Sequence, residues 1–241
     1  MTSVGHKALA SDTDRVLVIM AKAPRPGTVK TRLVPSLPLG AITDFYRCLL
    51  DDTLALARSL HGVEIAIMCP ESDVTALMEF AGTDAHVIAQ TGEGLAAGLT
   101  SVFAQFANTH PRRTIAFNSD SPHLPRSVLE NAFETLAMHD VVVGPTDDGG
   151  YYLIGAKAFH PTLFANNGMG TSSALERLLS RTGTLQLSVS FAETFYDIDV
   201  ADDLTRLAQE LRLDPARAPK TAVWLRSWER AVKQHRTTRQ S

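Results

Sequence analysis

Four cationic side chains follow a short apolar run near the start of the sequence. The run Arg15–Met20 has the composition of a buried strand, and the proline-containing segment after it carries Lys22, Arg25, Lys30 and Arg32. Arginine offers phosphate a planar fork of donors, whereas lysine offers a point charge. Because the carboxyl ends of strands border the ligand crevice of an open α/β sheet, this loop predicts phosphate binding. The alternative is a solvated connector whose cations only keep the surface soluble.

The same loop differs from the phosphate loop of P-loop kinases and ATPases. Gly27-Thr-Val-Lys30-Thr31 lacks the adjacent Gly-Lys-Ser/Thr and the glycine at fixed distance before it that a Walker A sequence requires. The sequence therefore disfavours a P-loop enzyme while it keeps the prediction of an anion site.

A carboxylate follows a second apolar run. Ile115-Ala-Phe-Asn-Ser leads directly into Asp120, so this side chain is expected at the same sheet edge as the cationic loop. Magnesium is commonly bound by one or two carboxylates together with substrate phosphates and water. Asp120 is thus predicted to form half of a metal site, and an ordinary turn ahead of Pro122 explains it equally well.

Asp199 is the candidate for the other half. It precedes a helical pattern that begins near Leu204, where it suits the N-cap position, and Asp202 suits the first turn. Capping is the simpler interpretation of Asp199 alone. The two roles are compatible, because one carboxylate oxygen can face the helix amides while the other faces an ion.

Residues 147–152 join two strand-like runs. Asp-Gly at such a junction is a strong hairpin signal, and a turn is the simplest interpretation. The functional alternative is that the two glycines let a ligand approach the backbone while Asp148 or Tyr152 contacts an acceptor. Gly92-Glu-Gly94-Leu95-Ala-Ala-Gly98 is one residue too long for a dinucleotide fingerprint, so a nicotinamide cofactor is not supported.

The elements that would position these residues alternate between strand and helix. Strand-like runs are expected at 16–20, 63–68, 86–89, 114–117, 141–144, 151–155 and 185–189, with helical patterns between most of them. Alternation of this kind predicts a three-layer α/β domain with a mostly parallel sheet covered on both faces. We expect a flexible N-terminus over residues 1–14, one domain over 15–212, and a cationic helix and tail over 213–241.

Composition limits the classes of function. The 241 residues include 44% hydrophobic and 20% charged residues and carry a formal net charge of −3, which argues against a nucleic-acid-binding role. No apolar run approaches the ~20 residues of a membrane helix. The two cysteines have no metal-ligand spacing, and a cytoplasmic location is expected. Trp224, Leu225 and Trp228 lie on one side of the C-terminal helix, which predicts packing against the domain or a second subunit in a homodimer; weak contact with an anionic surface is the alternative.

Together these motifs resemble the bacterial DUF2064 family, a glycosyltransferase-like family related to 2-phospho-L-lactate guanylyltransferase and to the molybdenum-cofactor nucleotidyltransferases. The resemblance covers roughly Val16 to Leu211. It depends on the residues of four segments, 22–33, 119–122, 144–155 and 197–204.

The resemblance implies the GT-A fold, a Rossmann-like α/β fold whose mostly parallel sheet is mixed, and it implies roles for individual residues. Lys22, Arg25, Lys30 and Arg32 match the nucleotide-phosphate loop, and Gly94 and Leu95 lie in a segment similar to the nucleoside-contacting segment of the guanylyltransferases. Asp120 and Asp199 match two metal-binding acids, for Mg²⁺ or Mn²⁺. The acceptor side is matched by Asp148, Gly149, Gly150 and Tyr151.

These residues predict a magnesium-dependent nucleotidyltransferase that joins a nucleoside triphosphate to a small phosphorylated or phosphonylated acceptor and releases pyrophosphate. In this prediction Lys30 and Arg32 hold the leaving group, and Asp120 and Asp199 hold the metal. The first alternative is a glycosyltransferase with a nucleotide-diphosphate sugar donor, for which a cationic loop is less useful. A nucleotide-binding protein without turnover is the second alternative.

Overall fold

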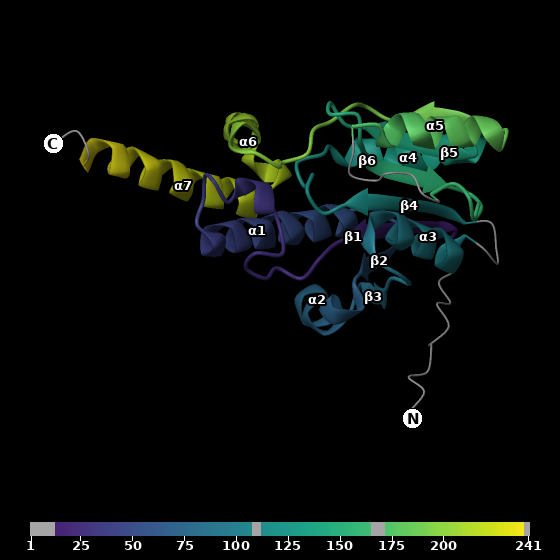
Figure 1. The fold of residues 1–241 in the computed structure, drawn as a ribbon, viewed down its shortest axis with the longest axis horizontal. Helices are drawn as coiled ribbons and strands as arrows, with labels where there is room; N and C mark the ends of the chain where they lie inside the picture. The colour runs from purple at the N-terminus through teal and green to yellow at the C-terminus, as the bar shows by residue number, and fades with distance from the viewer. Residues whose placement is uncertain (1–12, 108–111, 165–171, 239–241) are drawn as a thin grey trace, which may run out of the picture.

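A seven-stranded sheet forms the middle layer of the computed structural model, which describes residues 13–107, 112–164 and 172–238, with side chains described up to residue 231. The strands are β1 (Arg15–Met20), β2 (Glu64–Cys69), β3 (His86–Ala89), β4 (Arg113–Asn118), β5 (Val141–Pro145), β6 (Tyr151–Ala156) and β7 (Val189–Phe191) (Figure 1). The helices are α1 (Leu39–Arg58), α2 (Val74–Ala81), α3 (Gly94–Phe106), α4 (Arg126–Met138), α5 (Ala174–Thr184), α6 (Ala201–Leu213) and α7 (Pro219–Thr238). Short 3-10 turns lie at η1 (Thr31–Leu33), η2 (Glu71–Asp73) and η3 (Pro215–Arg217).

The strand order is β3-β2-β1-β4-β6-β5-β7. All neighbouring strands are parallel except that β6 runs antiparallel to both β4 and β5. The central strand β1 is buried on both faces, as its continuous apolar run predicts for a parallel strand. The predicted α/β fold with a mostly parallel, mixed sheet is confirmed.

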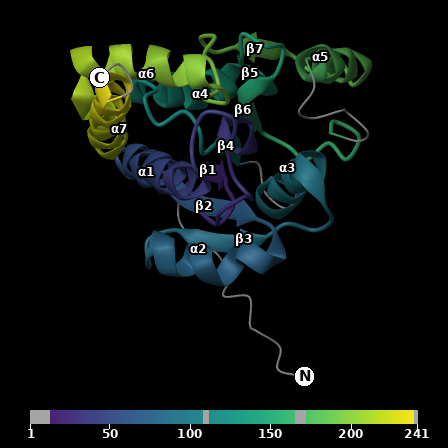
Figure 2. The ribbon, with the colours of Figure 1, turned by 60° about the vertical axis from the view of Figure 1, so that its left-hand side comes forward.

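Helices cover both faces of the sheet and complete the predicted three layers. One apolar core packs α1, α2, α4, α6 and the start of α7 against the sheet. The other core packs α3 and α5 against the opposite face, and Figure 2 shows these two helices across the strands from α1 and α7. The alternating side chains of each strand therefore face two separate cores.

The strand order reverses between β1 and β4. The chain runs from β1 outward to β2 and β3, returns through α3, and then places β4 on the other side of β1. In open α/β sheets, ligands bind outside the carboxyl ends of the strands at such a switch point. The segments after β1 and β4 both leave the sheet at this point.

The C-terminal helix α7 packs against α1. The rings of Phe45 and Trp224 have centroids 4.7 Å apart, and buried Asp52 accepts hydrogen bonds from the backbone N–H groups of Lys220 and Thr221 at 3.2 and 2.8 Å. The later part of α7 extends beyond the body of the domain (Figure 1). The start of this helix thus shares the domain core, as one of the two predicted packing modes requires.

Three local expectations need correction or a limit. The strand expected at 185–189 begins only at Val189, because α5 continues to Thr184 and Leu185 is its C-cap residue. Helix α2 was not expected. The predicted flexible N-terminus lies outside the described residues except for Thr13 and Asp14.

None of the described helices combines the length and apolar character needed to cross a membrane.

Candidate functional site

The loop after β1 and the end of β4 border one cavity of about 670 Å³. Its lining includes Lys22, Lys30 and Arg32 from the loop and Ser119 and Asp120 from the end of β4. The cavity therefore lies at the switch point, where the fold predicts a ligand.

Hydrogen bonds tie the two strand ends together through α1. The backbone N–H of Lys22 donates to the Tyr46 hydroxyl at 3.1 Å, and that hydroxyl lies 3.0 Å from the Ser119 hydroxyl. Burial and the nearby charge of Asp120 raise the pKa of Tyr46 to about 12, so it remains a neutral hydroxyl at physiological pH. Tyr46 and Ser119 are not among the predicted site residues, because an isolated tyrosine in a helical pattern is usually interpreted as a core residue.

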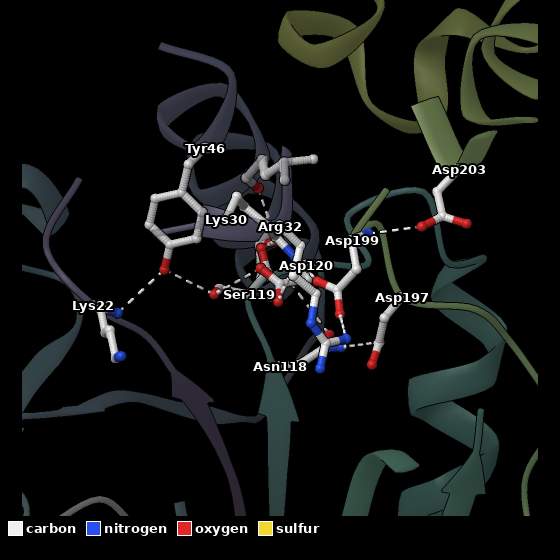
Figure 3. Close-up of polar contacts among 12 residues, drawn as sticks. Lys22, Lys30, Arg32, Tyr46, Asn118, Ser119, Asp120, Asp197, Asp199 and Asp203 are labelled. Carbon is white, nitrogen blue, oxygen red and sulfur yellow. Dashed lines mark hydrogen bonds and ion pairs between the residues drawn. The ribbon is translucent and has the colours of Figure 1, made fainter. Parts of the chain in front are cut away.

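Lys30 brings the two predicted metal ligands together. Its Nζ lies 2.8 Å from Oδ2 of Asp120 and 3.1 Å from Oδ1 of Asp199 (Figure 3). The Lys30 side chain is only 4% exposed, whereas the two aspartates are 27% and 33% exposed. Asp120 and Asp199 therefore lie on either side of one buried ammonium.

The electrostatics of this cluster favour the charged lysine. Burial acts to lower the pKa of Lys30, but the charges of Asp120 and Asp199 outweigh it and raise the pKa above its usual value. Lys30 is therefore a permanent cation at any physiological pH.

Arg32 and Asp203 fix the outer side of Asp199. Arg32, 63% exposed, places Nη1 2.9 Å from Oδ2 of Asp199. The expectation that Asp199 caps the following helix is wrong, because Val200 is the N-cap residue of α6. Asp203 does the capping from within the first turn, where its Oδ2 accepts hydrogen bonds from the backbone N–H groups of Asp199 and Val200. The Asp199 carboxylate is thereby left to face the cations.

A third carboxylate belongs to this cluster, and sequence reasoning missed it as a site residue. Asp197 accepts a 2.8 Å hydrogen bond from the Asn118 side chain at the end of β4. Burial and the charge of Asp120 raise the pKa of Asp197 to about 7. The signal for it was the spacing of Asp197 and Asp199, because residues two apart on an extended chain share a face.

The donor set of this cluster fits a hard divalent cation. Asp120 and Asp199 already share one cation, and carboxylate oxygens are the ligands that magnesium prefers. Among the described side chains, no group of three or more His, Cys, Asp or Glu converges closely enough to form an all-protein metal site. Two carboxylates together with substrate phosphates and water form a common type of magnesium site.

The remaining predicted nucleotide-binding residues divide into two groups. Lys22, Gly94 and Leu95 line the cavity. Arg25 does not, because its Nη1 lies 2.7 Å from Oδ1 of Asp73 and its Nη2 donates to the carbonyl of Ser72. The structure thus uses Arg25 to attach the loop to the segment before α2.

Gln90 supports the glycine-containing segment of the cavity. Its side-chain amide donates to the carbonyls of Gly92 and Gly94 at 2.9 and 3.3 Å. Gly98 faces this side chain, since a Cβ at that position would lie 2.8 Å from the Gln90 amide oxygen. These contacts hold the start of α3 against the cavity.

The predicted acceptor-side residues form the turn between β5 and β6. Asp148 Oδ1 accepts hydrogen bonds from the Thr146 hydroxyl at 2.6 Å and from the Gly150 backbone N–H at 3.0 Å, and these bonds hold its pKa below the usual range. Gly149, Gly150 and Tyr151 follow it, and none of these four lines the cavity. The negative charge of Asp148 nevertheless contributes to the raised pKa of Asp197, and the positive charge of Arg32 contributes to the lowered pKa of Asp148. The turn therefore borders the carboxylate cluster.

Solved structures share this fold. An inferred nucleotide-diphospho-sugar transferase from Desulfovibrio desulfuricans G20 is 24% identical, with a TM-score of 0.84 over 92% of this chain and 98% of that one. CMP:2-keto-3-deoxy-manno-octonic acid synthetase complexed with CTP is 12% identical, with a TM-score of 0.54 over 83% and 99% of the two chains. 4-Diphosphocytidyl-2C-methyl-D-erythritol synthase from Anaerococcus prevotii DSM 20548 is 10% identical, with a TM-score of 0.53 over 83% and 97%.

Sequence comparison adds the family. No curated protein matches the chain. One family model matches a shorter part of the chain than the segment over which the resemblance was predicted. The matched part includes Asp120 and the turn at Asp148 but not Lys30 or Asp199. Residues 53–171 match the family described as "Uncharacterized protein conserved in bacteria (DUF2064)", and this match confirms the family resemblance predicted from the sequence.

Proposed function

We propose that this protein is a magnesium-dependent nucleotidyltransferase that transfers a nucleotide from a nucleoside triphosphate to a small phosphorylated or phosphonylated acceptor. The observation that carries the proposal is the ion cluster of Lys30, Asp120 and Asp199 at the edge of the switch-point cavity. An acceptor oxygen attacks the α-phosphorus, the bond to the bridging oxygen breaks, and pyrophosphate leaves with the electron pair.

The charges of the cavity lining support a metal requirement. Three cations and three acids line it, namely Lys22, Lys30, Arg32, Glu93, Asp120 and Asp199, so their formal charges cancel. A triphosphate carries about four negative charges that such a lining leaves largely uncompensated. Bound between Asp120 and Asp199, magnesium would supply the missing positive charge and withdraw electron density from the phosphate.

The protein's own contribution is position and charge. Lys22 and Arg32 are exposed at the cavity edge, where they can bind the β- and γ-phosphates and stabilise the departing pyrophosphate. Lys30 adds a buried cation close to the acids. Removing one preorganised contact of this kind typically costs on the order of 100-fold in rate.

The acceptor is assigned to the side of the β5–β6 turn. Asp148, Gly149, Gly150 and Tyr151 border the carboxylate cluster without lining the cavity, so a molecule seated on them would approach the acids from outside the nucleotide. In-line displacement would then require the α-phosphorus to lie between this acceptor and the departing pyrophosphate.

Sugar transfer from a nucleotide-diphosphate sugar is the second candidate. The structure from Desulfovibrio desulfuricans G20 is described as a transferase of that kind, and Lys30 is held by acids rather than free to meet phosphate. Both reactions would use the same cavity and the same metal. The loop cations Lys22 and Arg32 favour nucleotidyl transfer, because pyrophosphate is the more highly charged leaving group.

A thermal-shift panel distinguishes the two reactions. The four common nucleoside triphosphates and their nucleotide-sugar counterparts are each added with and without magnesium. A ligand at 100 times its dissociation constant stabilises the fold by about 2.7 kcal/mol, so the donor should stand out. We expect the largest shift from one triphosphate with magnesium; stabilisation by nucleotide sugars alone would reject nucleotidyl transfer.

A further inference from the structure

The position that a metal would share between Asp120 and Asp199 is taken by the side chain of Lys30. Its Nζ lies 2.8 Å from one carboxylate and 3.1 Å from the other, which are direct ion-pair distances (Figure 3). The ammonium is also more deeply buried than either acid. A cation approaching from solvent therefore meets carboxylates that already have a counter-ion.

The backbone of Lys30 is held in place for this contact. Lys30 has φ +47° and ψ +41°, and Gln186 is the only other non-glycine residue with positive φ among the described residues. A left-handed backbone costs an ordinary residue roughly 1–2 kcal/mol. The carbonyl of Lys30 accepts a hydrogen bond from the N–H of fully buried Leu33, which helps to fix this backbone conformation.

We propose that Lys30 is the resident counter-ion of the metal site, occupying it in the nucleotide-free protein and moving to phosphate when a magnesium nucleotide binds. The inference rests on the proposed function and adds an order of events to it. A metal bound by the two oxygens that Lys30 contacts would lie beside a second positive charge at close range, so metal alone must displace the ammonium from its ion pairs. A triphosphate gives that ammonium a new anionic partner.

Because of this exchange, the affinity for metal and the affinity for nucleotide depend on each other. Metal alone binds weakly because Lys30 competes with it, whereas metal that arrives with triphosphate meets no competitor. By linkage, the nucleotide raises the affinity for metal by the same factor as the metal raises the affinity for nucleotide. Removing the ammonium should therefore strengthen the binding of metal alone.

The test measures binding of Mn²⁺ by the loss of its free-ion electron paramagnetic resonance signal, in the absence of nucleotide. The proteins are the unmodified chain, Lys30→Gln, Arg32→Gln and Asp120→Asn. Arg32→Gln is the matched control, because it removes one positive charge that also pairs with Asp199 but belongs to an exposed side chain. Asp120→Asn removes a proposed metal ligand.

We expect Lys30→Gln to bind Mn²⁺ about tenfold more tightly than the unmodified protein, which corresponds to about 1.4 kcal/mol. Arg32→Gln should change the affinity by less than about threefold, because exposed ion pairs contribute little. If Arg32→Gln gains as much as Lys30→Gln, or if neither gains, the counter-ion proposal is wrong while the metal site stands. Absence of any Mn²⁺ binding that depends on Asp120, in every protein tested, would reject the metal site itself.

Loss of the ammonium leaves two carboxylates facing each other, so stability must be measured in the same samples. Lys30→Asn is the second variant, because asparagine tolerates a left-handed backbone better than glutamine does. Its thermal midpoint should lie below that of the unmodified protein without metal and should rise more on addition of Mn²⁺. Equal rises in the two proteins would overturn the proposal.

Discussion

Gly149 in the β5–β6 turn offers a sharp test of how the turn proposed to bind the acceptor is packed. Its φ is +86°, and a Cβ added there would lie 2.2 Å from the carbonyl oxygen and 3.0 Å from the carbonyl carbon of Ser172. Both are backbone atoms that cannot rotate away. The N–H of Leu175 also donates to the Gly149 carbonyl at 3.1 Å, which holds the two segments together. Gly149→Ala must therefore separate this turn from the start of α5.

A matched glycine separates the backbone cost from the cost of the collision. Gly27 in the cationic loop has φ +78°, but a Cβ there would have no atom within 4 Å. Gly27→Ala should cost only the left-handed backbone, about 1–2 kcal/mol. Gly149→Ala adds overpacking of about 1–3 kcal/mol, for a total of about 2–5 kcal/mol.

Urea unfolding followed by circular dichroism measures both variants against the unmodified protein. We expect Gly149→Ala to lose clearly more free energy of unfolding than Gly27→Ala. Equal losses would show that Gly149 does not pack against Ser172 as described, and the placement of the β5–β6 turn against the start of α5 would be refuted.

Two further predictions concern buried groups away from the cavity. Burial, together with the charges of Arg217 and Arg206, lowers the pKa of His123 to about 3, so the unfolded chain binds one more proton than the folded protein between pH 6.5 and 3. The free energy of unfolding should therefore fall by up to about 1.4 kcal/mol per pH unit below pH 6.5. His123→Gln lacks the titrating group, so its free energy of unfolding, measured by urea titration from pH 6.5 to 4.5, should depend less on pH. An unchanged pH dependence would contradict this prediction. Asp52→Ala removes the acceptor of two N–H groups at the start of α7 and should cost about 1–3 kcal/mol in thermal unfolding. Asp51→Ala, which breaks only the ion pair with the Lys220 side chain, should cost less than about 1 kcal/mol, and equal costs would contradict capping by Asp52.

Much of the fold was predictable because it follows from local patterns. Apolar runs buried on both faces indicate parallel strands, and the Asp-Gly pair correctly indicated the hairpin that makes β6 antiparallel. The missed helix α2 is short, at Val74–Ala81, and has few residues over which a helical period can be recognised.

The site was predictable in its parts and not in its assembly. Each charged residue could be assigned to a strand end, but Lys30 and Asp199 are 169 positions apart, and no local pattern says that the ammonium lies between the acids. Arg25 illustrates the same limit, because its residue type suits phosphate and its actual partner is Asp73. Residue type restricts the chemistry of a side chain, whereas tertiary packing selects its partner.

Binding of a metal-bound nucleotide at this site is tested by calorimetric titration of the magnesium triphosphate that the thermal-shift panel selects. The proteins compared are the unmodified chain, Asp120→Ala and Arg25→Gln. We expect Asp120→Ala to lose at least about tenfold in affinity, because it removes a proposed metal ligand. Arg25→Gln should bind within about threefold of the unmodified protein, because Arg25 does not line the cavity. Binding that survives Asp120→Ala unchanged would contradict a metal-bound nucleotide at this site.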